Sequence, residues 1–442
     1  MMSRPSKRVR IRDPIHGTLR FDEDELQVID HRAVQRLRFI KQLGLADLAF
    51  PGATHTRYVH ALGTTHIATR MFETVSRNHT LSPEDRTRLR STLRLAALFH
   101  DLGHAPLSHT TERFMPPVDA LELGAWAAGG RRASHEDFTL KILLDSDLTQ
   151  LIRERFGPRG VRPEDIALLL SNRPPSRYRE RFILGSLNWL PILRQCVSSE
   201  LDADRMDYLL RDSYYAGVPY GRYDLDWLIE NLRAVQRGRD LHLALHARAT
   251  FGFEDYLLSR YHMFLSVYLH HVPVGYELMF KRYQEEREGE LAFPADVDAY
   301  LECDDIFLRS RLKDSSNVWA QRIIRRQAYR MLFEQREILD DGVEETGSAV
   351  EDLMESLRAA DIPAISHGVK GKLSKYFTPS ASRPPVSTEP ELFVLDEHGN
   401  VQPIETYSPL YRRYAGSVVL RRIYVDPDHL ASARRLMGGA DE

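Results

Sequence analysis

The stretch Leu93-Arg-Leu-Ala-Ala-Leu-Phe-His-Asp-Leu-Gly-His104 decides how the rest of this chain is interpreted. Its apolar residues predict a buried helix, over residues 85–101, that ends in the pair His100-Asp101 and is followed at once by Gly103. Buried imidazole and carboxylate groups are costly unless they are paired or bind a cation. The end of this helix is therefore a candidate metal site.

Two distant residues, His60 and Asp204, complete a set of two histidines and two carboxylates. Taken alone, His60 is better explained as a core histidine and Asp204 as a buried ion-pair partner. Taken together, the four form a mixed nitrogen and oxygen set, which suits iron, manganese or zinc and leaves positions open for water and substrate. We therefore predict one divalent transition metal bound by His60, His100, Asp101 and Asp204.

The composition narrows the class of protein. The chain has 442 residues, which is long for one core, a net charge of -3, and two cysteines. This balance shows no overall basic field for long nucleic acid and no disulfide framework, so a reducing, cytoplasmic location fits. We find neither a secretory signal nor a long uncharged apolar run, so neither export nor a membrane-spanning segment is expected.

Helical periodicity dominates the first two thirds of the chain, and the expected fold class is mainly α. Residues 8–21 predict a short hairpin, residues 116–134 a loop over the site, and residues 241–245 a strand. The predicted helices cover residues 31–43, 58–79, 85–101, 135–156, 163–172, 180–190, 196–215, 224–234 and 252–288, with a kink or break at Pro273.

The character of the chain changes after about residue 290. Helical pieces continue to about residue 361, and residues 378–390 are rich in proline and serine and predict a loop or linker. Residues 392–404 then predict a hairpin, residues 417–425 a further strand, and Asp426 the start of a last helix. The C-terminal part is therefore expected to be a smaller α+β region.

Six blocks, in order along the chain, carry a resemblance to a known family. They are Asp13–Gly17, Gln35–Gly44, Phe50–Gly63, His100–His109, Ser134–Glu136 and Leu201–Asp212. With these blocks the chain resembles the HD-domain metal-dependent phosphohydrolases, and within them the deoxynucleoside triphosphate (dNTP) triphosphohydrolases. We divide it into an HD-type catalytic domain with the hairpin, residues 1–285, and the α+β region, residues 286–442. No SAM domain is expected, because the first block begins near residue 10.

The resemblance implies an activity, the hydrolysis of dNTPs to deoxynucleoside and tripolyphosphate, with magnesium arriving on the substrate triphosphate. Two rival functions stay open. One is that of another HD phosphohydrolase, such as a phosphodiesterase or nuclease on short single strands, or a hydrolase of a signalling nucleotide. The other is a nucleotide-sensing module without turnover.

Further histidines are candidates for catalysis. His104 lies one turn after His100 and is expected to face the same cavity, while Glu112 follows His109 by three residues and can orient and charge that ring. Imidazole titrates near neutral pH, which suits a general acid for the departing 5′ oxygen. The resemblance implies this role for His109, an acidic partner at Glu112 and an active-site histidine at His135. The alternative is that these residues are supporting or helix-capping groups.

Contacts to the substrate rest mostly on the resemblance. The candidates are Gln42, Leu43, Arg57, Arg205, Tyr208, Asp212 and Tyr261. Gln42 and Leu43 match positions that touch the sugar, and Arg57 and Arg205 are expected to face the phosphates. The alternatives are plain ion pairs for the two arginines and core packing for the tyrosines.

A regulatory site is a separate hypothesis. Asp30, Gln35 and Arg38 match the pattern by which some relatives hold a guanine nucleotide activator, GTP or dGTP, between subunits. A homo-oligomer, either a dimer or a tetramer, is expected on the same resemblance. The alternative is that Asp30 is the N-cap of helix 31–43 and that Arg38 is simply exposed.

Overall fold

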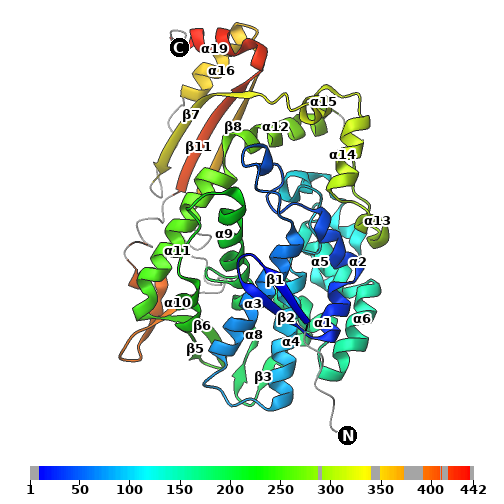
Figure 1. Ribbon diagram of the computed structural model, residues 1–442, viewed down its shortest axis with the longest axis vertical. Helices are drawn as coiled ribbons and strands as arrows, with labels where there is room; N and C mark the ends of the chain where they lie inside the picture. Colours follow the sequence, from blue (N-terminus) through cyan, green and yellow to red (C-terminus); the bar gives the residue numbers. More distant parts are fainter. Residues whose placement is uncertain are drawn as a thin grey trace.

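The computed structural model describes residues 9–286, 291–339, 349–372, 392–408, 410 and 417–438. The fold is mainly helical, as predicted, with a few small sheets (Figure 1). A helical body forms the lower part of Figure 1, and the C-terminal sheet with helices α16 and α19 forms the upper part. In the part of the chain that the structure describes, no helix combines the length and the apolar character needed to cross a membrane.

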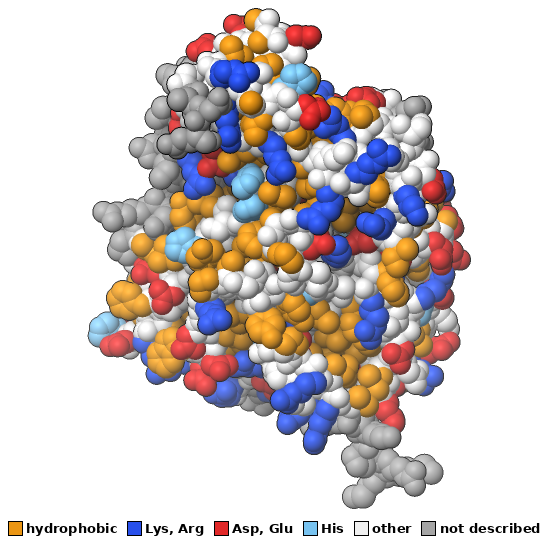
Figure 2. Space-filling view, turned by 45° about the horizontal axis from the view of Figure 1, so that its top comes forward, with side chains coloured by type: hydrophobic (Ala, Val, Ile, Leu, Met, Phe, Trp, Pro, Cys, Tyr) orange, Lys and Arg blue, Asp and Glu red, His pale blue; other side chains and the backbone are white. Residues whose placement is uncertain are grey.

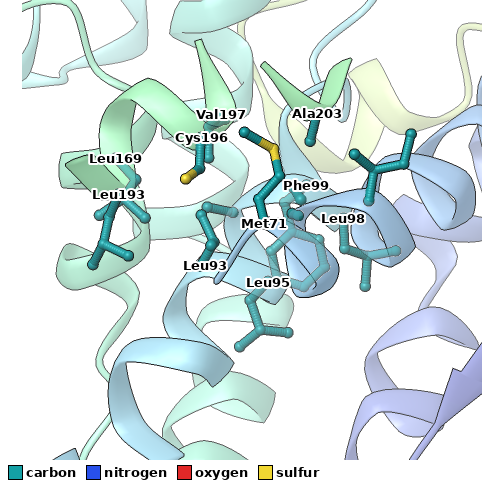
Figure 3. Close-up of a cluster of buried hydrophobic side chains, with 14 of the residues drawn as sticks. Met71, Leu93, Leu95, Leu98, Phe99, Leu169, Leu193, Cys196, Val197 and Ala203 are labelled. Carbon is teal, nitrogen blue, oxygen red and sulfur yellow. The ribbon is translucent and has the colours of Figure 1, made fainter. Parts of the chain in front are cut away.

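Three helices build the site: α3 (Arg57–Val75), α4 (Pro83–Phe99) and α9 (Ala203–Ala216), with α3 packed against both of the others. Helix α4 is the helix predicted from the apolar stretch. Ser82 accepts a hydrogen bond from Asp85 N at its start, and Pro83 stands in the first turn, where a missing N–H costs nothing. Figure 3 shows the core that its apolar side chains enter, which includes Met71, Leu93, Leu95, Leu98, Phe99, Leu193 and Cys196.

The other elements surround these three helices. The helices are α1 (Glu23–Ile29), α2 (Arg32–Gln35), α5 (His135–Leu144), α6 (Asp147–Phe156), α7 (Pro163–Leu170), α8 (Leu190–Val197), α10 (Leu225–Glu230), α11 (Thr250–Met263), α12 (His271–Glu286), α13 (Val297–Leu301), α14 (Asp305–Asp314), α15 (Val318–Ile324), α16 (Ala349–Ala359), α17 (Ile404–Tyr407) and α19 (Leu430–Leu436). The strands are β1 (Val9–Asp13), β2 (Gly17–Phe21), β3 (Ile183–Leu184), β4 (Leu187–Asn188), β5 (Leu232–Arg237), β6 (Asp240–His246), β7 (Arg330–Leu339), β8 (Ala364–Lys372), β9 (Phe393–Leu395), β10 (Val401–Pro403) and β11 (Ser417–Val425).

The predicted strands form, and they join strands that the sequence did not predict. Strands β1 and β2 make the N-terminal hairpin, and the hairpin β9–β10 adds to β6 by parallel pairing of β9. Strand β11 lies between β7 and β8 in an antiparallel sheet. Strands β7 and β8 come before and after α16. The sequence predicted helical pieces up to about residue 361 and neither of these two strands. The predicted linker at residues 378–390 lies outside the described residues.

The predicted helix over residues 31–43 is wrong in length. Only α2 and a short 3-10 turn, Arg36–Phe39, form there, and the chain then becomes extended. Tertiary contacts decide this, because Ile40 O accepts a hydrogen bond from Arg57 N and Lys41 N donates to the Asp305 carboxylate. The N-cap of α2 is His31, whose Nδ1 accepts from Ala33 N, so the explanation of Asp30 as an N-cap is also wrong.

Four other predictions need correction. The stretch 180–190 forms a 3-10 turn and the β3–β4 hairpin instead of a helix. The helix 135–156 divides at Ser146, which caps α6, and the helix 196–215 divides before Asp202, which caps α9. The loop 116–134 does not line the cavity described below; its Val118 and Leu121 belong to a second apolar cluster.

Candidate active site

A cavity of about 410 Å³ opens beside the ends of α4, α7 and α8, the first turns of α5, one face of α9, and the segment before α3. Of the residues predicted for metal, catalysis and substrate, those that line it are Gln42, Leu43, Arg57, His100, Asp101, His104, His109, His135, Asp204, Arg205, Tyr208 and Asp212. His60 and Glu112 do not line the cavity themselves, but they contact residues that do, Asp204 and His109 respectively. Tyr261 does not line the cavity.

Four side chains from three helices converge at one point of this cavity. His60 Nε2, from α3, lies 3.2 Å from His100 Nε2, which caps α4, and 3.0 Å from Asp204 Oδ1 of α9. Asp101 Oδ1 lies 3.3 Å from His100 Nε2. Bonds of about 2.0–2.2 Å to a first-row metal separate its ligand atoms by roughly 3 Å. The ligand atoms of His60, His100 and Asp101 all lie within 4.8 Å of one another, so these three fit one metal ion, and Asp204 Oδ1 lies 3.0 and 3.6 Å from the two imidazoles.

The outer hydrogen bonds of both imidazoles support the same fit. His100 Nδ1 contacts the carbonyl oxygen of Ala97 at 2.8 Å, and His60 Nδ1 contacts Asp207 Oδ2 at 2.7 Å. Because both partners only accept, each Nδ1 carries a hydrogen, and each Nε2 can offer a lone pair to a metal once it carries no proton. The two Nε2 atoms lie 3.2 Å apart and repel each other unless a proton or a metal ion lies between them. The residues therefore fit a divalent metal.

The electrostatics of the site favour positive charge. Burial lowers the pKa of His60, but hydrogen bonds to Asp204 and Asp207 outweigh it and raise this pKa to about 10. Burial raises the pKa of Asp204, yet the two histidines hold it far below its usual range. The site thus stabilises a positive charge among its carboxylates, and a metal ion would take the place of that proton.

Arg57 was predicted to face the phosphates, and the structure gives its guanidinium other partners. Its Nη1 donates to Asp101 Oδ2 at 2.5 Å, while Nε and Nη2 donate to Ser108 Oγ at 2.9 and 2.7 Å. Burial raises the pKa of Asp101, but Arg57 and the histidines His100 and His104 lower it well below its usual range. Arg57 therefore keeps a candidate ligand ionised and oriented.

The other histidines gather around Glu112. Its Oε1 lies 3.3 Å from His109 Nδ1 and also forms a short contact with His135 Nδ1, which the sequence did not reveal. The ring of His104 stacks on that of His135, with centroids 3.9 Å apart. Burial, and then Arg57, lower the pKa of His104 well below its usual range, so this ring stays neutral. His109 is the exposed member, with 69% of its side chain accessible.

Gln42, Leu43, Tyr208 and Asp212 line the cavity together with Tyr268. Asp212 Oδ1 contacts His55 Nε2 at 2.7 Å, and Asp212 Oδ2 accepts a hydrogen bond from the Tyr268 hydroxyl at 2.9 Å. Among the described residues, the buried Gln42 Oε1 has no hydrogen-bond partner. Tyr268 therefore lines the cavity, whereas Tyr261, the predicted residue, does not. The two lie about two helical turns apart, and sequence spacing alone does not tell which one reaches the cavity.

The remaining predicted residues lie in two places. Arg205 lines the cavity, and its Nη1 donates to Ser199 O and to the Asp202 carboxylate. Arg38 Nε donates to Gln35 Oε1 at 2.7 Å, and its guanidinium covers the Tyr58 ring at 3.6 Å. Asp30 is exposed, and none of the three regulatory candidates lines the cavity.

Comparisons with known proteins confirm the resemblance drawn from the sequence. A model of the HD domain matches residues 57–180, and a model of an HD associated region matches residues 223–362. A solved structure of a hypothetical protein from Aquifex aeolicus matches with a TM-score of 0.68 and 26% identity, over 98% of this chain and 100% of that one. The chain therefore contains an HD domain.

Two relatives illustrate the range of similar proteins. The chain is 32% identical over 325 residues to an uncharacterised protein of Methanocaldococcus jannaschii. That match covers 73% of this chain and 59% of the relative. It is also 29% identical over 282 residues to a Dictyostelium discoideum protein named a deoxynucleoside triphosphate triphosphohydrolase SAMHD1 homolog. That match covers 63% of this chain and 49% of the relative. The chain thus spans about half the length of the curated relatives that it matches.

Proposed function

We propose that this chain, which contains an HD domain and resembles the HD-type phosphohydrolases, is a metal-dependent hydrolase of dNTPs. The observation that carries the proposal is the convergence of His60 Nε2, His100 Nε2, Asp101 and Asp204 at the wall of a nucleotide-sized cavity. A deoxynucleotide is favoured because a relative bears the name of such an enzyme and because Gln42, Leu43 and Tyr268 line the same cavity.

In the proposed reaction, water attacks the α-phosphorus of the dNTP and the bond from that phosphorus to the 5′ oxygen breaks. The products are deoxynucleoside and tripolyphosphate. A divalent metal held by the four ligands would lower the pKa of water and neutralise charge at the phosphate. His109 gives a proton to the departing 5′ oxygen, and the Glu112 carboxylate, 3.3 Å from His109 Nδ1, holds the ring in place.

We propose that the triphosphate binds beside Arg205. Arg205 lines the cavity. Among the described contacts, its carboxylate partner Asp202 accepts from Nη1 alone, so we propose that the rest of the guanidinium binds phosphate oxygens. Magnesium is proposed to accompany the triphosphate as a counter-ion. Tyr208, Asp212 and Tyr268 are proposed to contact the sugar, with Gln42 Oε1 accepting from it.

The regulatory and cellular parts of the proposal are independent of the chemistry. Asp30, Gln35 and Arg38 are proposed to bind GTP or dGTP between subunits of a homo-oligomer, a dimer or tetramer. The Arg38–Gln35 hydrogen bond supports a shared surface for these two side chains, and Gln35 Nε2 donates to the backbone oxygen of Ile29, next to Asp30. A cytoplasmic location belongs to the proposal as well, since both cysteines, Cys196 and Cys303, are free and buried.

One assay tests the function directly. Each dNTP and NTP is incubated with the purified protein and iron, manganese or zinc, with and without GTP, and the products are separated by chromatography. We expect deoxynucleoside and intact tripolyphosphate from dNTPs, and neither product from a variant carrying His100→Ala and Asp101→Ala. Nucleoside monophosphate or cleaved short strands would indicate a phosphodiesterase or nuclease instead. Nucleotide binding without product would indicate a sensing module.

A further inference from the structure

A buried carboxylate behind the metal cluster has a full set of hydrogen-bond donors. Asp207 lies one turn after Asp204 on α9, and its side chain is fully buried. Its Oδ2 contacts His60 Nδ1 at 2.7 Å and accepts from Arg211 Nε at 2.8 Å. Its Oδ1 accepts from Arg211 Nη2 at 2.9 Å and contacts His16 Nε2 at 2.6 Å. Asp207 therefore joins His16 to His60.

His16 is held by the turn of the N-terminal hairpin. Asp13 Oδ1 accepts from the backbone nitrogens of Ile15 and His16 at 2.9 and 2.8 Å, and Asp13 Oδ2 accepts from Arg211 Nη1 at 2.9 Å. Gly17 closes the turn with φ at +73°, a conformation that favours glycine. The block Asp13–Gly17, which has no other place in the proposed chemistry, thus fixes both His16 and Arg211 against Asp207.

Helix α3 leaves room for this network at Gly63, close to His60 on the same helix. A Cβ atom at residue 63 would stand 1.9 Å from Asp207 Oδ1 and 2.3 Å from Arg211 Nη2. The network therefore occupies the space that any side chain at this position would need. His16, with 3% of its side chain accessible, contacts the same carboxylate oxygen, Asp207 Oδ1.

We propose that His16 is a positioning residue for the metal ligand His60, acting through Asp207. The inference rests on the proposed metal-dependent function. A carboxylate that accepts hydrogen bonds on both of its oxygens cannot rotate freely. Asp207 therefore holds the His60 ring with Nδ1–H toward itself and Nε2 toward the candidate metal site. Without His16, Asp207 Oδ1 loses one of its two donors, and the carboxylate and the His60 ring gain freedom. Loss of such outer partners typically weakens metal binding by about 10–100-fold.

The test compares His16→Leu, His16→Gln and a matched control, His66→Leu. The His66 ring stacks on His16 with centroids 5.6 Å apart and lines the same surface pocket, yet Asp207 is bonded to His16 and not to His66 among the described contacts. Mn²⁺ is titrated into each chelator-treated, full-length protein and followed by electron paramagnetic resonance. The thermal midpoint of each metal-free protein is measured alongside.

We expect His16→Leu to bind Mn²⁺ about 10–100-fold more weakly, and His66→Leu to bind like wild type. His16→Gln should stay within about threefold of wild type, because its amide nitrogen can stand where Nε2 stands and donate to Asp207. Equal binding by His16→Leu and wild type, or equal weakening by His66→Leu, would overturn the inference.

Two outcomes separate this inference from the proposed function. If wild type binds no Mn²⁺, the metal site itself fails and the inference falls with it. If wild type binds and His16→Leu does not fold, His16→Gln decides. A folded Gln variant weakened more than about tenfold refutes the role of His16 as a hydrogen-bond donor to Asp207.

Discussion

Gly63→Ala is the substitution whose effect follows most directly from the geometry. The added Cβ would stand 1.9 Å from Asp207 Oδ1 and 2.3 Å from Arg211 Nη2, whereas real Cβ contacts essentially never fall below 3.0 Å. Asp207 and Arg211 have fully buried side chains, so neither can move into solvent. The substitution therefore separates the two charges or displaces both from their partners.

The magnitude follows from two opposing effects. Breaking a buried ion pair costs about 3–5 kcal/mol, and alanine in place of glycine inside a helix returns about 1 kcal/mol. The free energy of unfolding should therefore fall by roughly 2–4 kcal/mol. Disturbing Asp207 should also weaken metal binding by about 10–100-fold, since Asp207 holds His60.

Urea unfolding followed by circular dichroism measures the stability, and metal analysis after dialysis measures the retained ion. Gly157→Ala is the matched control, because its Cβ would meet nothing within 4 Å and its φ of -53° suits alanine. That control should lie within about 1 kcal/mol of wild type. If Gly63→Ala proves as stable and as rich in metal as Gly157→Ala, the description of a tight network behind His60 is wrong.

Three further predictions concern catalysis, pH and regulation. His109→Ala should keep the metal and lower the chemical step in single-turnover assays by about 10²–10⁴, and an unchanged rate would move the acid elsewhere. Burial, with His16 and Arg70 nearby, lowers the pKa of His66 to about 4, below its value in the unfolded chain. Between about pH 6.5 and 4 the folded ring is therefore neutral, while the unfolded chain binds one extra proton. Urea unfolding at several pH values should therefore show stability falling as pH falls through this range, less steeply in His66→Gln, and parallel curves would contradict this. Asp30→Asn should leave stability and metal content unchanged, because Asp30 caps no helix by its side chain. It should nevertheless abolish GTP-dependent activation in rate assays and GTP-dependent assembly in size-exclusion chromatography. Intact activation would remove Asp30 from the regulatory site.

Long amphipathic helices were predictable from the sequence, and short elements were not. Helices α3 and α4 follow their apolar periodicity to within a few residues. The stretch 31–43 has similar periodicity, yet it ends early because Lys41 and Ile40 bond to residues far along the chain. Strand β7 was missed because its stability comes from pairing with β11, about ninety positions later.

The candidate site divides in the same way. Residue types and order were enough to bring His60, His100, Asp101 and Asp204 forward as one set, and the structure brings them together. Their supporting partners could not be predicted, because a pair such as His16 and Asp207 is separated by 191 positions and has no spacing signature. For the same reason, the sequence could not tell that Arg57 holds Asp101.

The face of the molecule in Figure 2 bears on the choice of substrate. Basic and acidic side chains are interspersed over that face, in keeping with a net charge of -3. Long nucleic acid is bound chiefly through extended basic surfaces. The small nucleotide that we propose as substrate needs no such surface, because it is held inside one cavity.

The central claim is that water attacks the α-phosphorus of a dNTP and that the bond to the 5′ oxygen breaks. Turnover of dNTPs in oxygen-18 water, with mass spectrometry of both products, tests it most directly. We expect one labelled oxygen in the tripolyphosphate, on the phosphorus that was attacked, and none in the deoxynucleoside. A label in the deoxynucleoside, or labelled nucleoside monophosphate in place of tripolyphosphate, would contradict it.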